Sequence, residues 1–218
     1  MAFGKRDKDS DIHKLIDHPC VQHKLAIIRD AETGHKRFRE LATEITKFLC
    51  YEALQNIPTK EIMVTTPVGQ ARARKIATDI VVVPILRAGV GMLDGILELV
   101  PTARVGFVGL FRDEATKQPM TYYERFPPQI KGGTCFVIDP MVATGGSTVA
   151  ALDLLKSNGA ENIVVICIVT CPEGLARVNE EHPDVPVYTA AIDERLDERK
   201  YIVPGLGDAG DRLFGTPH

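Results

Sequence analysis

The second half of the chain alternates apolar runs with amphipathic segments. The apolar runs are long enough for strands, and they lack the polar alternation of a strand with one wet face, so they suit parallel strands covered on both sides. They cover residues 79–86, 103–111, 134–139, 162–170 and 185–192. Helical spacing of apolar residues predicts helices between them, at 90–100, 147–159 and 172–182. This order predicts an α/β fold with a five-stranded, mainly parallel sheet flanked by helices.

The first part of the chain has a different pattern. Phe38, Leu41, Ile45, Phe48 and Ala53 follow helical spacing, which predicts an amphipathic helix over about 33–54 with a buried apolar stripe. We therefore expect a single domain over 1–218, with N-terminal helices in 1–57, a strand pair in 58–78, an α/β core in 79–193 and a C-terminal segment in 194–218.

The connection 112–131 is too long for an idle loop and lies between apolar strands, so we predict a functional flap. Tyr122 and Tyr123 either help to close this flap or only pack it.

Composition limits the class of protein. The 218 residues are 44% hydrophobic and 25% charged, which is ordinary for a globular domain. A net charge of −3 gives no general attraction to nucleic acid. The first residues are too polar for a signal peptide, and no apolar run is long enough to span a membrane. These features predict a cytoplasmic protein that binds neither nucleic acid nor membrane.

The five cysteines form no CxxC pair. They lie at positions 20, 50, 135, 167 and 171, and we expect buried free thiols. Cys20 and His23 have a spacing that metals can use, but no second pair accompanies them, so no protein-bound metal is predicted.

The segment 135–155 holds the strongest chemical signal. An apolar strand ends at Asp139, a Thr144-Gly-Gly-Ser turn follows, and an amphipathic helix begins there. Glycines allow close approach of the backbone, and free N–H groups at a helix start attract an anion, while a carboxylate at the strand end suits the hydroxyls of a ribose. The alternative is that Ser147 only caps the helix. We favour a site for a phosphorylated pentose.

Arg87 follows the strand 79–86 directly and could grip pyrophosphate oxygens, although a surface ion pair would explain an isolated arginine as well. The glycines that follow, Gly89 to Gly95, superficially match a dinucleotide-binding fingerprint. The last glycine comes one residue late, so we reject a nicotinamide site.

Residues 137–147, VIDPMVATGGS, resemble the phosphoribosyl pyrophosphate (PRPP) motif of type I phosphoribosyltransferases, and the Asp-Pro-Met version is similar to that of uracil phosphoribosyltransferases. Many relatives carry two acids where this chain has Asp139 and Pro140. Residues 201–211, YIVPGLGDAGD, resemble the uracil-binding segment of the same family. The resemblance implies transfer of 5-phosphoribosyl from PRPP to N1 of uracil, giving UMP and diphosphate in pyrimidine salvage.

The resemblance also implies the site residues. It assigns PRPP to Arg87, Arg112, Asp139, Pro140, Met141, Val142, Ala143, Thr144, Gly145, Gly146, Ser147 and Asp208, and uracil to Ile202, Gly207, Asp208 and Ala209. Asp139 and Asp208 would orient the substrates and stabilise the transition state, without a covalent nucleophile. Mg²⁺ would be carried by PRPP rather than by direct protein ligands. The resemblance further implies that the flap 112–131 is a flexible β-hairpin over the active site.

Other functions are weighed against this one. A pyrimidine-responsive RNA-binding attenuation regulator shares the fold, but such regulators resemble the two-acid form of the motif. A purine or orotate phosphoribosyltransferase is disfavoured by the segment 201–211. A homo-oligomer, dimer or tetramer, is expected from the apolar N-terminal helix, and GTP as an allosteric activator follows only from the resemblance, because the sequence places no effector pocket.

Overall fold

The computed structural model describes residues 12–112 and 119–216. The helices are α1 (Pro19–Arg29), α2 (His35–Leu54), α3 (Val90–Leu97), α4 (Gly146–Ser157), α5 (Pro172–Glu181), α6 (Ala209–Phe214) and the short 3₁₀ helix η1 (Pro128–Ile130). The strands are β1 (His13–Leu15), β2 (Thr59–Thr66), β3 (Gly69–Ile76), β4 (Ile80–Leu86), β5 (Arg104–Val105), β6 (Phe107–Arg112), β7 (Pro119–Arg125), β8 (Thr134–Ile138), β9 (Met141–Val142), β10 (Asn162–Thr170), β11 (Val187–Ile192), β12 (Arg195–Leu196) and β13 (Ile202–Val203).

A nine-stranded sheet forms the centre of the molecule, in the order β1-β11-β10-β8-β4-β6-β7 with the short strands β5 and β9 beside it. Every pairing is parallel except that of β6 with β7. The predicted α/β class with a mainly parallel sheet is confirmed, and the five predicted runs supply β4, β6, β8, β10 and β11. The count of five was too low, because β1, β5 and β9 are too short to stand out and because β7, part of the predicted hairpin, joins the same sheet. The run 103–111 also divides at Gly106 into β5 and β6.

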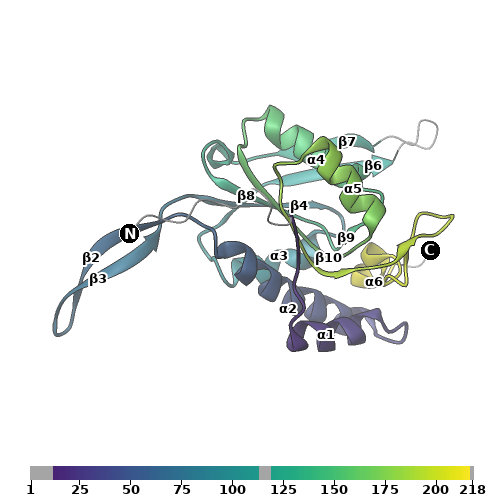
Figure 1. The fold of residues 1–218 in the computed structure, drawn as a ribbon, viewed down its shortest axis with the longest axis horizontal. Helices are drawn as coiled ribbons and strands as arrows, with labels where there is room; N and C mark the ends of the chain where they lie inside the picture. The colour runs from purple at the N-terminus through teal and green to yellow at the C-terminus, as the bar shows by residue number, and fades with distance from the viewer. Residues whose placement is uncertain (1–11, 113–118, 217–218) are drawn as a thin grey trace.

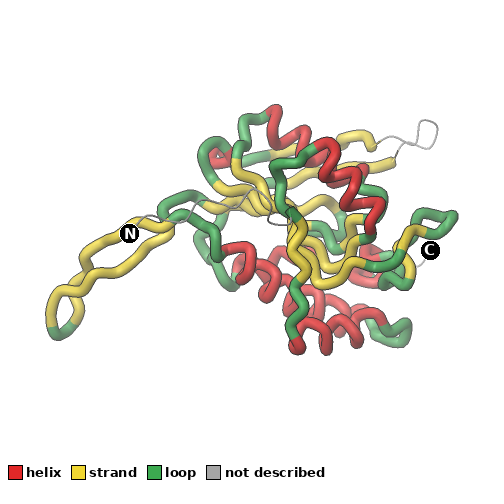
Figure 2. The backbone as a smooth tube through the Cα atoms, viewed as in Figure 1, coloured by secondary structure: helices red, strands yellow, loops and turns green. Residues whose placement is uncertain are grey.

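Helices cover the two faces of the central sheet as separate layers (Figure 1, Figure 2). Val82 and Phe136 point toward α1, α2, α3 and α6, whereas Val81 and Val137 point toward α4 and α5. All four side chains are fully buried. Burial on both faces explains why these strands read as continuous apolar runs.

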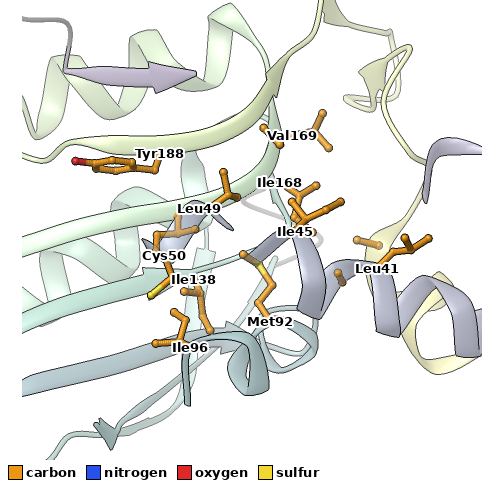
Figure 3. Packing of buried hydrophobic residues seen from close by; sticks show 14 of the residues in the cluster. Leu41, Ile45, Leu49, Cys50, Met92, Ile96, Ile138, Ile168, Val169 and Tyr188 are labelled. Carbon is orange, nitrogen blue, oxygen red and sulfur yellow. The ribbon is translucent and has the colours of Figure 1, made fainter. Parts of the chain in front are cut away.

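The predicted helix over 33–54 is α2, and its buried stripe packs on the sheet. Leu41, Ile45 and Leu49 belong to one buried cluster with Met92 of α3 and Ile168 of β10 (Figure 3). The expected stripe is therefore correct, except that Phe48 is only half-buried and Leu49 takes its place in the core.

Two features near the N-terminus differ from the sequence-based expectation. The region expected to be helical contains a strand, β1, which pairs with the edge strand β11. Cys20 is exposed, whereas the other four cysteines are buried and free. The buried stripe of α1 runs through Val21, Leu25 and Ile28, so Cys20 lies outside it.

The strands expected in 58–78 form an antiparallel hairpin, β2–β3, paired from Thr59 with Ile76 to Thr66 with Gly69. The hairpin extends away from the rest of the molecule (Figure 1). Met63 and Val68 on it are exposed. It therefore presents apolar side chains outside the core.

Among the helices of the described residues, none combines the length and the apolar character that crossing a membrane requires.

Candidate functional site

The site lies where the parallel strands end at their carboxyl edge. Arg87 follows β4, and Asp139 follows β8. The loop after β4 packs directly on the end of β8, because a Cβ built at Gly89 would lie 2.4 Å from the carbonyl oxygen of Ile138. Only glycine allows this contact, which brings the Arg87 loop beside Asp139. The peptide bond between Leu86 and Arg87 is cis.

The loop after Asp139 presents N–H groups rather than carbonyls. The Pro140 carbonyl accepts hydrogen bonds from the N–H groups of Ile168 and Val169 at 3.0 and 3.1 Å. The Val142 carbonyl accepts from the Thr170 hydroxyl at 2.8 Å. The carbonyls on this side are thus held by β10, and the first N–H groups of α4 have no carbonyl partner within their own helix. Such a loop is suited to a phosphate.

Gly145 sets the start of α4. Its φ of 76° is left-handed, and it is the N-cap residue, with no side-chain cap hydrogen bond. Ser147 is exposed within the first turn of the helix. The alternative interpretation, in which Ser147 caps the helix, is therefore wrong, and its hydroxyl is available to a ligand.

Helix α5 packs behind this loop, and its residue Gly174 allows the close contact. Sequence reasoning did not predict this role for Gly174. A Cβ built at Gly174 would lie 2.4 Å from the carbonyl oxygen of Ala143 and 2.5 Å from that of Val142. Arg177 of the same helix borders the loop, with its Nη1 3.3 Å from a Cβ built at Gly146. Two features of the sequence could have indicated this support of the loop: a glycine in the first turn of a predicted helix, and an arginine one turn later.

Asp139 is half-buried, and its Oδ1 accepts a hydrogen bond from the N–H of Met141 at 3.4 Å. Burial, together with a smaller effect of the negative charge of Asp208, raises the pKa of this carboxyl to about 7, although the hydrogen bond from Met141 opposes the rise. The cost of burial therefore outweighs the hydrogen bond from Met141, and the carboxylate form of Asp139 is destabilised in the folded protein.

Asp208 and Arg87 complete this cluster. The Asp208 side chain caps α6 by accepting a hydrogen bond from the N–H of Asp211 at 2.9 Å. Arg87 is largely exposed, and its Nη2 lies 3.5 Å from Oδ1 of Asp211. A Cβ built at Gly210 would lie 3.2 Å from Oδ1 of Asp208 and 3.7 Å from Nη2 of Arg87. One cation and two carboxyls at positions 87, 139 and 208 thus share one edge of the sheet.

The C-terminal segment brings its predicted base-binding residues to this edge. Ile202, in β13, is buried, and Ala209 begins α6. Gly207 has a φ of 76° between them. The positive φ turns the chain here and leaves its backbone accessible.

The expected hairpin over 112–131 is described only in part, because residues 113–118 lie outside the described residues and nothing is described of the Arg112 side chain. Strands β6 and β7 form its antiparallel stem. Tyr122 packs over Gly109, where a built Cβ would lie 2.6 Å from its ring, and its ring centroid is 6.4 Å from that of Phe111. Tyr122 therefore packs within the hairpin, and both tyrosines are exposed.

This arrangement can bind an anion at the α4 loop, a polyol at Asp139 and a second anion at Arg87. In the described part of the chain, no three His, Cys, Asp or Glu side chains form a group that could hold a metal ion.

Comparisons with known proteins agree with this geometry. The family model described as uracil phosphoribosyltransferase matches residues 15–216. A uracil phosphoribosyltransferase of Symbiobacterium thermophilum is 54% identical over 203 residues, covering 93% of this chain and 97% of the relative. One of Enterococcus faecalis is 52% identical over 204 residues, covering 93% of this chain and 98% of the relative.

Solved structures show the same fold. The AQ2163 protein of Aquifex aeolicus superposes with a TM-score of 0.89 at 38% identity, covering 94% of this chain and 98% of that one. A hypoxanthine phosphoribosyltransferase of Staphylococcus aureus superposes with a TM-score of 0.51 at 14% identity, covering 85% of this chain and 91% of that one, and this likeness concerns the fold alone.

Proposed function

The chain belongs to the uracil phosphoribosyltransferase family, and we infer that it is a pentosyltransferase that transfers the 5-phosphoribosyl group of PRPP to N1 of uracil. The products are UMP and diphosphate. The observation that carries this conclusion is the meeting of the α4 phosphate loop, Asp139 and the segment 201–211 at one edge of the sheet.

In the reaction, the bond from the anomeric carbon to pyrophosphate breaks, and pyrophosphate leaves with its electron pair. A bond forms from the same carbon to N1 of uracil, which gives up its proton. Such a displacement develops positive charge on the ribose ring and negative charge on the leaving group, so orientation and charge stabilisation lower the barrier without a covalent intermediate.

We propose that the N–H groups and hydroxyls of 143–147 hold the 5′-phosphate and that Asp139 accepts hydrogen bonds from the ribose hydroxyls. Arg87 would hold the pyrophosphate, since its exposed guanidinium lies beside Asp208 and can leave the weak contact with Asp211. Arg112 is assigned to PRPP by family resemblance. Backbone groups of Ile202, Gly207 and Ala209 would meet the uracil edge.

Magnesium fits this site as a companion of PRPP. The carboxyls of Asp139 and Asp208 are close enough to interact electrostatically, and a divalent cation would compensate their charge. Asp139 and Asp208 would hold the cation through its waters, and it would supply charge neutralisation of the pyrophosphate. In this proposal Asp139 binds and orients the ribose, and Asp208 caps α6.

Further proposals concern assembly, regulation and location. The projecting hairpin β2–β3 with exposed Met63 and Val68 supports a homo-oligomer, dimer or tetramer, which light scattering would measure. GTP as an allosteric activator stays a proposal from family resemblance, tested by assays with and without GTP. Five free thiols suit a reducing cytoplasm.

The experiment is product formation from PRPP, magnesium and each of uracil, cytosine, orotate, hypoxanthine and xanthine, with chromatographic separation of the nucleotides. UMP from uracil alone is expected, because an amino group in place of a carbonyl would leave buried donors unpaired. Product from another base at a comparable rate would contradict the proposed specificity. No product from any base would favour the RNA-binding alternative, which filter binding with a pyrimidine leader RNA would test.

A further inference from the structure

An ion pair outside the predicted site holds the base-binding segment from behind. Arg29, the last residue of α1, and Asp193, directly after β11, form a two-pronged pair. Nη1 of Arg29 lies 2.7 Å from Oδ2 of Asp193, and Nη2 lies 2.6 Å from Oδ1. The Asp193 side chain is 6% exposed and that of Arg29 is 23% exposed, so the pair is largely shielded from water.

Both members of the pair also bind the backbone of Gly205. The N–H of Gly205 donates to Oδ2 of Asp193 at 2.8 Å, and its carbonyl accepts from Nη1 of Arg29 at 2.6 Å. Gly205 has a φ of 60°, and a Cβ built there would lie 2.1 Å from the carbonyl oxygen of Ile202. The turn is therefore closed tightly on itself and tied at both of its peptide groups.

The next carbonyl along the chain is held by a second guanidinium. Nη1 of Arg212, in α6, donates to the carbonyl of Leu206 at 2.8 Å. The Arg212 guanidinium carbon lies 4.5 Å from the ring centroid of Phe38 in α2. Two consecutive carbonyls thus face two arginines, which fixes the orientation of the peptide groups that follow at Gly207 and Asp208.

We propose that Arg29 and Asp193 are positioning residues for the pyrimidine base: they set the backbone of 205–207 so that its donors and acceptors match the uracil edge. This inference depends on the proposed function. Neither residue touches PRPP in this proposal, because the pair lies behind the base segment, on the side of α1. Loss of the Arg29–Asp193 pair should therefore weaken the binding of uracil more than the binding of PRPP.

The test uses variants that keep a polar side chain of similar size at each position, since truncating one partner of a shielded pair would risk unfolding. Arg29→Lys keeps the charge but loses the planar fork that reaches both Asp193 and the Gly205 carbonyl. Asp193→Asn keeps an acceptor for the Gly205 N–H and weakens its hold on Arg29. Lys24→Met is the matched control, because Lys24 also lies on α1 in an ion pair, with Glu44, away from the segment.

Two measurements are made on each variant. Hydrogen exchange of a peptide that covers 202–208 reports the hold on the backbone without any substrate. Steady-state kinetics then give KM for uracil and for PRPP separately. We expect faster exchange and a KM for uracil raised about tenfold in Arg29→Lys and Asp193→Asn, with KM for PRPP within about twofold.

A purely structural role would lower the active fraction and the melting temperature without separating the two KM values. Unchanged exchange in Arg29→Lys, equal changes in both KM values, or the same effects in Lys24→Met would overturn the proposal. If the wild type makes no UMP while the two variants still exchange faster than the wild type over 202–208, the proposed function is overturned. The assignment of this segment to a base is then overturned with it.

Discussion

Replacing Asp139 by asparagine should stabilise the ligand-free protein while impairing its reaction. Burial and the charge of Asp208 raise the pKa of this carboxyl from 3.8 to about 7 in the folded chain. Between these two values the folded state keeps a proton that the unfolded chain has already released. Stability contributed by this group is therefore present at low pH and is lost as the pH rises through about 7.

The magnitude follows from the shift. About three pH units at ~1.4 kcal/mol each set an upper bound of about 4 kcal/mol. Asp139 is only half-buried, so relaxation and water reduce the effect, and we expect about 1–3 kcal/mol at pH 8. Asparagine has a similar shape and no charge, so the Asp139→Asn variant escapes this penalty.

The assay is urea unfolding of wild type and Asp139→Asn at pH 4.5 and pH 8, at one protein concentration so that any assembly contributes equally. The variant should gain stability over the wild type at pH 8 and lose that advantage at pH 4.5. Its turnover should fall about 10- to 100-fold, the effect of losing a charged hydrogen-bond acceptor. Equal stability differences at the two pH values, or near-normal turnover, would refute this reasoning.

Asp184→Asn is the matched control for the sign. Lys156 lowers the pKa of Asp184 through a hydrogen bond at 2.7 Å, so its carboxylate is favoured in the folded state. Neutralising it should therefore destabilise the protein slightly at pH 8, opposite to the change at Asp139, and should leave turnover unaffected.

Other substitutions separate loop support, ligand binding and core packing. Gly174→Ala would place a Cβ 2.4 Å from a loop carbonyl, so it should cost about 1–3 kcal/mol in urea unfolding and raise KM for PRPP, whereas Gly34→Ala, with no atom within 4 Å, should cost less than about 1 kcal/mol. Arg87→Met removes an exposed cation, so stability should stay within about 0.5 kcal/mol while kcat/KM for PRPP falls about 10- to 100-fold. A destabilised variant with normal PRPP kinetics would contradict that assignment. Phe136→Ala empties a fully buried position and should lower the free energy of unfolding by about 3–5 kcal/mol. A loss below about 1 kcal/mol would show that the sheet does not pack there on the layer of α1, α2, α3 and α6 as described.

The sequence predicted the parts of the fold that depend on local pattern. Strands buried on both faces, such as β8 and β10, read as apolar runs, and α2 read as a stripe of helical spacing. Strand β1 has three residues, too few for any periodicity, and becomes a strand only because the edge of β11 accepts it. The exposure of Cys20 likewise depends on which face of α1 meets the core.

The candidate site divides in the same way. The α4 loop could be predicted because strand, acid, glycines and helix follow one another within a short stretch. Arg29 and Asp193 could not, because they are 164 residues apart and each resembles an ordinary surface charge until the fold joins them. The role of Gly174 was hidden for the same reason, since the carbonyl that excludes a side chain belongs to a different βα unit.

The pairing of β1 with β11 has a consequence for how the protein is made. His13 pairs with Val187, so the first strand emerges from the ribosome long before its partner exists. At ordinary rates of synthesis this delay is on the order of ten seconds or more, during which β1 lacks its final neighbour. The base segment, which requires Arg29 near the start and Asp193 near the end, is completed only after almost the whole chain is released. A nascent chain truncated before β11 lacks Asp193 and Gly205, so the contacts that hold the turn at Gly205 cannot form in it. In the function proposed above, the part of the site that meets the base is therefore the last to be completed.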